Sequence, residues 1–193
     1  MKTSTWLATH VLAVALSAPL FADTTPQNLE ANCDAVQMRG SVAQISATHS
    51  TVFTSILIDA APTAVWSTLT NFETMPDWSN GTLQTITGDI SDGGSVVVTF
   101  LFGTDDQGNP VANEIPHNLI YTEGEIFGWS DPFPAEIGGG HDNHLYQVVP
   151  CNGKTLFVQS DEIVNNPYAA NFVNTLLPGY QQFNAELKAT VEQ

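Results

Sequence analysis

Positively charged residues are scarce in this chain, which has 4 Lys and Arg against 20 Asp and Glu among 193 residues and a net charge of −16. Proteins that bind nucleic acids or anionic membrane surfaces use clusters of basic residues to neutralise phosphates. The basic residues here are Lys2, Arg39, Lys154 and Lys188, which are scattered. The composition therefore argues against both kinds of partner. Solubility accounts for the acidity, and a cationic ligand is the alternative explanation.

Cysteine is scarcer still, since Cys33 and Cys151 are the only two. No C-x-x-C pair occurs, so the chain has no zinc or redox motif of that kind. In an oxidising compartment two lone cysteines usually pair. A disulfide between these two would close a long loop, tie the N-terminal segment to a turn at residues 150–153, and stabilise the fold by up to about 4–5 kcal/mol. Two free thiols are the alternative.

Several catalytic fingerprints are missing as well. The sequence has no G-x-S-x-G nucleophile elbow, no phosphate-binding loop and no dinucleotide-binding glycine pattern. Their absence argues against serine hydrolases and against enzymes that use nucleotides or NAD, and we expect no cofactor. No segment after residue 22 is long and apolar enough to span a bilayer, so we also expect no membrane insertion.

The first 22 residues have the pattern of a secretory signal peptide. Lys2 precedes an apolar run at residues 11–16, and residues 20–22 are close to an A-x-A cleavage site. A membrane anchor is the alternative, but the run is shorter than the roughly 20 residues that a span needs. We predict cleavage near Ala22 and a secreted or periplasmic protein, whose 3 basic and 20 acidic residues give a net charge of −17. The sequon at Asn80 matters only in a eukaryotic host.

The rest of the chain divides into an extension and one domain. Residues 23–49 have no clear hydrophobic period, and we assign them to an N-terminal extension. From residue 50 onward, alternating β-branched runs bounded by Gly and Pro turns predict antiparallel strands. The predicted strands cover residues 50–58, 82–88, 95–102, 111–114, 118–127, 141–149 and 155–164. Two short helices are predicted after the first strand, at residues 63–70 and 72–75.

A long amphipathic helix is predicted for residues 167–192. Apolar side chains recur there at the i, i+3, i+4, i+7 spacing of one helix face, and we expect a kink at Pro178 and Gly179. A sheet with one apolar face must be covered, and this helix is the only element large enough. The predicted fold class is therefore α+β, with a curved antiparallel sheet around the terminal helix. A gap between these two layers would form a ligand pocket.

Three stretches, in order, resemble the SRPBCC superfamily, the START-like group of polyketide cyclase/dehydrase and lipid-transport proteins with the helix-grip fold. They are S-I-L-I-D-A-A-P-T-A-V-W with the following L-T-N-F and M-P-D-W at residues 55–78, H-L-Y-Q-V and F-V-Q-S-D within residues 144–161, and the helix end at residues 180–192. The resemblance implies a helix-grip domain at residues 50–193. The export signal, the extension and the three glycines at residues 138–140 depart from the family pattern. Because the family includes carriers, hormone receptors and aromatase/cyclases, the fold alone does not define a function.

The predicted strand at residues 141–149 carries the densest group of chemically active side chains. Side chains alternate between faces along a strand, so Asp142, His144 and Tyr146 share one face and His141 lies on the other. A metal site that used both histidines would need an irregular strand, and we predict no metal. The resemblance implies that His144 and Tyr146 face the cavity.

The next strand places Phe157, Gln159 and Asp161 on one face, which by resemblance is also the inner face. A buried acid must be paired, and Asp161 beside His144 would form the base and orienting acid of acid–base catalysis. A polar anchor that orients a ligand, or a purely structural pair, is the alternative.

Further candidate ligand contacts are His117, Tyr121 and Trp129, and the loop at residues 130–140 is a candidate lid. We expect a secreted or periplasmic protein that binds a hydrophobic small molecule, such as a lipid, a polyketide or a terpenoid-like compound. The alternative is a cyclase, dehydratase or isomerase of the same family that acts on such a compound by His/Asp catalysis. A third possibility is a structural protein whose own side chains fill the pocket.

Overall fold

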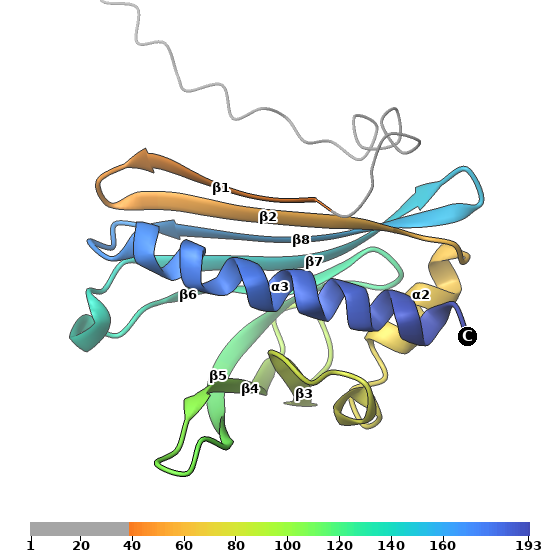
Figure 1. Ribbon diagram of the computed structural model, residues 1–193, viewed down its shortest axis with the longest axis horizontal. Coiled ribbons are helices and arrows are strands. Elements are labelled where there is room, and N and C mark those ends of the chain that lie inside the picture. Colours follow the sequence, from red (N-terminus) through yellow and green to blue (C-terminus); the bar gives the residue numbers. More distant parts are fainter. Residues whose placement is uncertain (1–38) are drawn as a thin grey trace, which may run out of the picture.

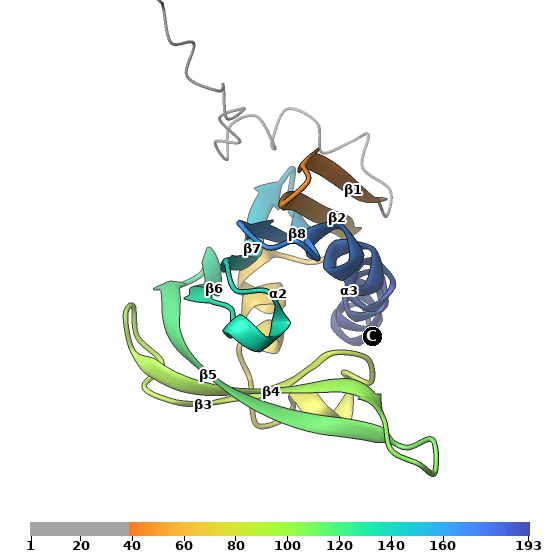
Figure 2. The same cartoon turned by 90° about the vertical axis from the view of Figure 1, so that its left-hand side faces the viewer.

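One curved sheet and one long helix form the framework of the molecule. The computed structural model describes residues 39–193, and within them eight strands form an antiparallel sheet in the order β1-β2-β8-β7-β6-β5-β4-β3. The sheet curves around helix α3 (Figures 1 and 2). The strands are β1 (Arg39–Ser46), β2 (His49–Ile58), β3 (Leu83–Gly88), β4 (Ser95–Thr104), β5 (Pro110–Thr122), β6 (Ile126–Pro132), β7 (His141–Cys151) and β8 (Lys154–Val164). The helices are α2 (Pro62–Leu69) and α3 (Ala169–Val191), with 3-10 turns η2 (Met75–Asp77) and η3 (Ala135–Ile137). The predicted α+β helix-grip architecture is confirmed.

Strand β1 lies within the segment that we assigned to an extension. It pairs antiparallel with β2 and forms one edge of the sheet, so the sheet begins before residue 50. Nearly all of its side chains are exposed, and the sequence therefore has no apolar alternation to mark it. The predicted signal peptide, the rest of the extension and Cys33 lie outside the described residues.

The middle of the sheet differs from the prediction in where its strands end. Instead of strands at residues 111–114 and 118–127, the chain forms β5 and β6 around a turn at Gly124, where φ is 80°. Glu-Gly is a weaker hairpin signal than Asn-Gly or Asp-Gly. Strand β5 also continues through Pro116, because its pairing with β6 begins only at Leu119 and a proline is tolerated where a strand has one neighbour.

The short helix α2 confirms the first of the two predicted helices. Pro62 occupies its first turn, and Val65, Trp66 and Leu69 are buried against the sheet. The second, predicted at residues 72–75, is instead the 3-10 turn η2. Pro76 lies in the first turn of η2, where its missing N–H is not needed, so it starts this turn and does not end an earlier helix.

Helix α3 is continuous through Pro178, so the predicted interruption does not break it. The absence of a side chain at Gly179 lets the helix approach the start of β3, since a Cβ there would lie 2.7 Å from Thr82 Cγ2. The C-terminal half of α3 buries Phe183 and Leu187 in the main core. This leaves the N-terminal half to face a cavity. Within residues 39–193, no helix is both long and apolar enough to cross a membrane.

Candidate functional site

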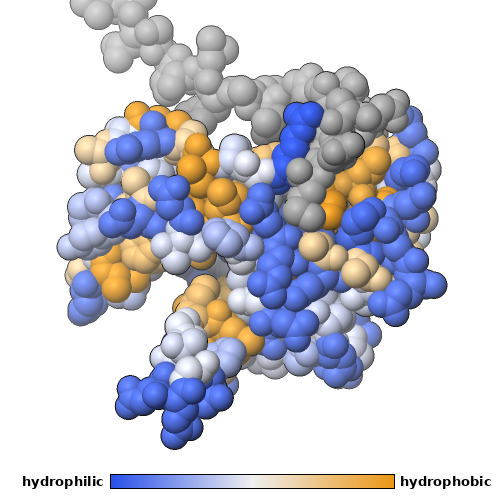
Figure 3. Space-filling view, in the orientation of Figure 1, coloured by the Kyte–Doolittle hydropathy of each residue, from blue (hydrophilic) through white to orange (hydrophobic). Residues whose placement is uncertain are grey.

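A cavity of about 720 Å³ lies between the sheet and the N-terminal half of α3. Strands β4 to β8, the loop after β6 and helix α3 all contribute to its wall. The surface is hollowed between the projecting β4–β5 hairpin and the part of the molecule above it, and hydrophobic side chains border the hollow (Figure 3). The volume lies within the roughly 300–1,000 Å³ that is typical of small-molecule sites.

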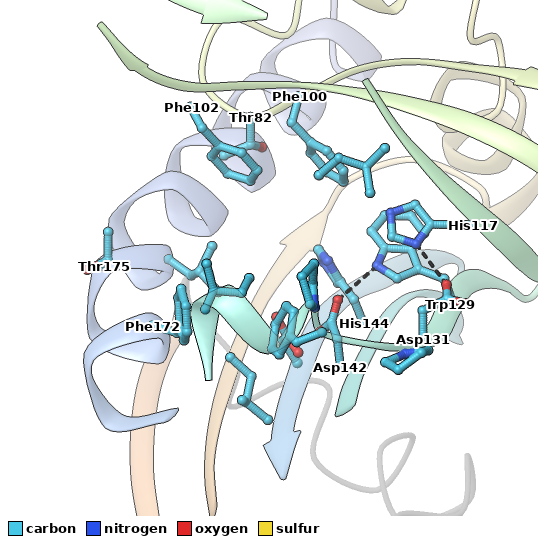
Figure 4. Close-up of a pocket in the computed structure, with 18 of the residues that line it drawn as sticks. Thr82, Phe100, Phe102, His117, Trp129, Asp131, Asp142, His144, Phe172 and Thr175 are labelled. Atoms are coloured by element: carbon cyan, nitrogen blue, oxygen red, sulfur yellow. Dashed lines mark hydrogen bonds and ion pairs between the residues drawn. The ribbon is translucent and has the colours of Figure 1, made fainter. Parts of the chain in front are cut away.

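Aromatic side chains make up much of the wall. Phe100 and Phe102 of β4 lie on one side of the cavity, away from the polar groups at Asp142 (Figure 4). Phe172 of α3 stacks on Phe133 of the loop after β6, with 5.5 Å between the ring centroids. The wall therefore suits an apolar ligand body.

The polar floor of the cavity comes from β7 and β8. Asp142, His144 and Tyr146 alternate along β7 and share one face, as the strand pattern predicted, and all three line the cavity. His144 is the direct register partner of Asp161 on β8. His141 lies on the opposite face, where its Nε2 is 2.7 Å from the Ser130 hydroxyl.

A hydrogen-bond chain connects His144 to Asp161 through Tyr180 of α3. The Tyr180 hydroxyl donates to Asp161 Oδ2 at 2.9 Å and lies 3.2 Å from His144 Nδ1. The Gln159 amide nitrogen lies 3.0 Å from His144 Nε2. Because the Gln159 amide donates and the Tyr180 proton goes to Asp161, the consistent tautomer carries its proton on Nδ1. Both ring nitrogens of His144 are thus engaged by the protein.

Burial determines the charge states of these hydrogen-bonded side chains. It lowers the pKa of His144 to about 4, against the opposing effect of Asp161, so the imidazole is neutral near pH 7. Burial also raises the pKa of Tyr146 and Tyr180 well above 10, so both hydroxyls keep their protons. The floor is therefore a network of largely neutral hydrogen-bonding groups around Asp161.

Asp142 is the most strongly perturbed carboxyl group of the cavity. Burial, and then the nearby Asp161, raise its pKa to about 10, although a hydrogen bond from Trp129 acts in the opposite direction. The Trp129 indole donates to Asp142 Oδ2 at 3.2 Å (Figure 4). Asp142 is consequently protonated near neutral pH.

A hydrogen bond between His117 and Asp131 lies beside the Trp129 indole ring. His117 Nδ1 is 2.8 Å from Asp131 Oδ2, and the imidazole stacks on Trp129 with 4.7 Å between ring centroids (Figure 4). Burial lowers the pKa of His117, and the contact with Asp131 opposes this shift. Strands β5 and β6 thus add a further acidic residue to the cavity wall.

Several buried polar atoms at the cavity have no hydrogen-bond partner within the described part of the chain. They are Asp142 Oδ1, Asp161 Oδ1, His117 Nε2 and the hydroxyls of Tyr146 and Thr82. An unpaired buried polar group costs about 1–3 kcal/mol, and a ligand or water that reaches these atoms would remove that cost.

The predicted site residues are brought together in part. Five of them line the cavity, namely His144, Asp161, Tyr146, Trp129 and His117. Gln159 is hydrogen-bonded to one of these residues, His144. The other two predicted ligand contacts lie outside the lining.

Those two residues, Phe157 and Tyr121, pack into other parts of the molecule. Phe157 is buried in the main core beside Phe183. Tyr121 packs on Trp66 and hydrogen-bonds to Glu123. The inward face of β8 extends beyond the cavity into the core, and alternation alone cannot tell where one gives way to the other.

Two important site residues were given no role by the sequence. Asp142 shares the strand face of His144, but alternation reports only a face and not the neighbouring carboxyl group that changes its chemistry. Tyr180 looks like any apolar position of an amphipathic helix, and only the packing of α3 on β8 places its hydroxyl at Asp161.

The loop predicted as a lid forms part of the cavity wall. Residues 130–132 belong to β6, and Phe133, Pro134 and Ile137 line the cavity. Asn166, which is fully buried, holds this loop by donating to the carbonyl oxygens of Ile137 and Gly139 at 3.0 and 2.7 Å. Movement of the loop stays a prediction. Within residues 39–193, no three His, Cys, Asp or Glu side chains are grouped as metal ligands would be.

Comparison with known proteins identifies similar folds. No family model and no curated protein matches the sequence. A protein of unknown function from Staphylococcus aureus has a TM-score of 0.54 at 16% identity, over 75% of this chain and 94% of that one. Ara h 8.0201 has a TM-score of 0.54 at 14% identity, over 74% of this chain and 97% of that one.

The di-domain ARO/CYC protein BexL from the BE-7585A biosynthetic pathway has a TM-score of 0.58 at 11% identity, over 77% of this chain and 52% of that one. Identities this low carry information about the fold alone. Together these likenesses confirm the helix-grip fold that the sequence resemblance implied.

Proposed function

We propose that this protein binds a hydrophobic small molecule in the cavity between the sheet and α3. The observation that carries the proposal is a cavity of about 720 Å³ with an aromatic wall and unpaired polar atoms at its floor. Apolar lining with a few convergent polar groups is the usual composition of a ligand site. A structural core filled by its own side chains would leave no such volume.

The ligand class that we propose is a lipid, a polyketide or a terpenoid-like compound, and the site of action is outside the cytoplasm. The apolar lining supports the first point and the N-terminal sequence pattern supports the second. N-terminal sequencing of the protein from its own host tests export, because the predicted mature chain begins near Asp23.

Native mass spectrometry of the protein from its own host, followed by solvent extraction, is the test of binding. We expect a stoichiometric apolar ligand. A protein that arrives empty and also fails to bind a panel of apolar dyes would contradict the proposal.

Acid–base catalysis on such a ligand is the second candidate function, and the chain His144–Tyr180–Asp161 is the observation that favours it. In this function His144 would act as base or acid, and Asp161 would orient it through Tyr180. The resting geometry favours binding, since both nitrogens of His144 are engaged.

Incubation of the extracted ligand, or of its biosynthetic precursor, with fresh protein separates the two functions. A carrier returns the compound unchanged. An enzyme returns a product of altered mass or retention time, and His144→Ala and Asp161→Asn abolish that product.

A further inference from the structure

The unpaired polar atoms at the cavity share one property, which is that they accept hydrogen bonds. Asp142 Oδ1 and Asp161 Oδ1 are oxygens of two neighbouring carboxyl groups, and His117 Nε2 is left as an acceptor because Nδ1 contacts Asp131. The Tyr146 hydroxyl accepts as well as donates. Asp161 and Tyr146 are only 4% and 0% exposed, and both line the cavity. A ligand that supplies hydrogen-bond donors can therefore satisfy this floor.

No positive charge is available to an anionic ligand at this floor. Within the described residues, neither Lys nor Arg lines the cavity. Lys154 pairs with Asp59 at 3.1 Å, and Lys188 binds the carbonyl oxygen of Leu57 and the carboxylate of Glu192. A buried carboxylate or phosphate would thus lie near acidic side chains without a counterion, which is strongly unfavourable. A free fatty acid is a poor candidate on this ground.

We propose that the cavity selects an amphipathic amine, meaning a protonated nitrogen on an apolar body, and that the nitrogen binds between Asp142 and Asp161. These two residues are diagonal neighbours across β7 and β8, because His144 pairs with Asp161 and Asp142 pairs with Ile163. Trp129, whose indole N–H contacts Asp142 Oδ2, and Tyr146 line the same cavity with their ring centroids 5.8 Å apart, and aromatic rings attract cations. The inference rests on the proposed function, since it names the class of ligand for the same cavity.

The proton held by Asp142 gives this inference a second consequence. An ammonium group supplies the positive charge that the proton supplies in the empty cavity, so the amine should displace that proton. The titratable groups that surround the floor are Asp131 and Asp161, His117 and His144, and Tyr146 and Tyr180. None of them brings a competing positive charge near pH 7, because burial keeps both imidazoles neutral.

Three probes with the same apolar body test the selectivity. Naphthylethylamine, naphthylethanol and naphthylacetate are compared at pH 7 for displacement of the neutral dye Nile red from the full mature protein. We expect the amine to bind about ten- to a hundredfold more tightly than the alcohol, as charge-assisted hydrogen bonds would give, and the carboxylate to bind most weakly. Calorimetry in two buffers of different protonation enthalpy should show proton release with the amine and none with the alcohol.

Two variants and a matched control locate the amine. Asp161→Asn and Asp142→Asn should each weaken the binding of the amine by at least about tenfold and change the affinity for the alcohol by less than about threefold. Asp142→Asn should also abolish the release of a proton when the amine binds. Glu136→Gln removes one acid outside the cavity lining and should change neither probe. Circular dichroism checks that each variant is folded.

Each outcome decides between the inference and the function on which it rests. If the dye binds but the amine and the alcohol have equal affinities, or the carboxylate binds most tightly, the selectivity for an amine is overturned. The proposal of hydrophobic binding then still stands. Equal loss of amine binding in Glu136→Gln also overturns it, because only total charge would then matter. Failure of the dye and of all three probes to bind overturns both.

Discussion

Asp142 and His144 lie two positions apart on β7, and the same physical cause shifts their pKa values in opposite directions. Burial penalises the charged form of each, so the acid keeps its proton and the base loses it. Each residue therefore makes folding stability depend on pH, with opposite signs.

Asp142→Asn should stabilise the protein at neutral and alkaline pH. The pKa of Asp142 is raised from 3.8 to about 10, so its contribution to stability is complete below about pH 4 and decreases as the pH rises toward 10. The amide has the shape of the protonated acid and avoids this loss. We expect a gain on the order of 2 kcal/mol at pH 8 and none near pH 4, measured by thermal melts over that range. Asp77→Asn, an exposed control, should show no gain that grows with pH.

His144 should destabilise the fold in mild acid. Its pKa is lowered from 6.5 to about 4, so the unfolded chain gains a proton in this interval that the folded protein does not take up, and stability falls as the pH drops from 6.5 to 4. The full loss is on the order of 2–3 kcal/mol. In urea melts at pH 7 and pH 5, the His144→Gln variant should be less stable than the unchanged protein at both values. Its stability should, however, decrease less between pH 7 and pH 5. An unchanged pH slope in the variant would contradict the assignment.

At the scale of elements, hydrophobic patterning predicted what the sheet and α3 bury but not every strand end. The alternation on β7 placed Asp142, His144 and Tyr146 on one face, and the family resemblance implied that this face and the face of Asp161 on β8 point inward, as they do. Strand β1 lacked a pattern because it buries little. The meeting of Tyr180 with Asp161 was beyond prediction because it depends on the packing angle between α3 and the sheet.

Asn166 is the residue that ties the loop after β6 to the start of α3. Asn166→Ala would remove the hydrogen bonds to the carbonyl oxygens of Ile137 and Gly139 and the one from the Tyr168 backbone N–H, and we expect a loss of about 1–3 kcal/mol. Hydrogen exchange should accelerate at residues 133–140, and the off-rate of a bound dye should rise. The exposed Asn171→Ala, in the first turn of the same helix, is the control. Exchange that accelerates across the whole sheet would show general destabilisation and not release of this loop.

At the scale of the whole molecule, the export prediction and the cysteine prediction depend on each other. Cys151 is buried with Val149, Leu156 and Val158 in a small cluster apart from the main core, at the hairpin between β7 and β8. An oxidising compartment would allow its predicted bond to Cys33.

The predicted disulfide should be visible in the intact mass. We expect the oxidised protein to be about 2 Da lighter than the reduced protein, and we expect Cys33→Ser with Cys151→Ser to lose about 2–5 kcal/mol of stability. Melts with and without reductant provide the measurement, and the double variant should not respond to reductant. Complete alkylation of two thiols in the unreduced protein from its own host would contradict the pairing.

Among the described tryptophans, Trp129 alone lines the cavity, whereas Trp66 and Trp78 lie in or against the main core. Its ring contacts His117 and His144, and its indole nitrogen holds Asp142. The electronic environment of this one chromophore therefore changes with whatever occupies the floor. Binding can therefore be followed by tryptophan fluorescence without a label, and the change in emission should be lost in Trp129→Phe, which keeps Trp66 and Trp78.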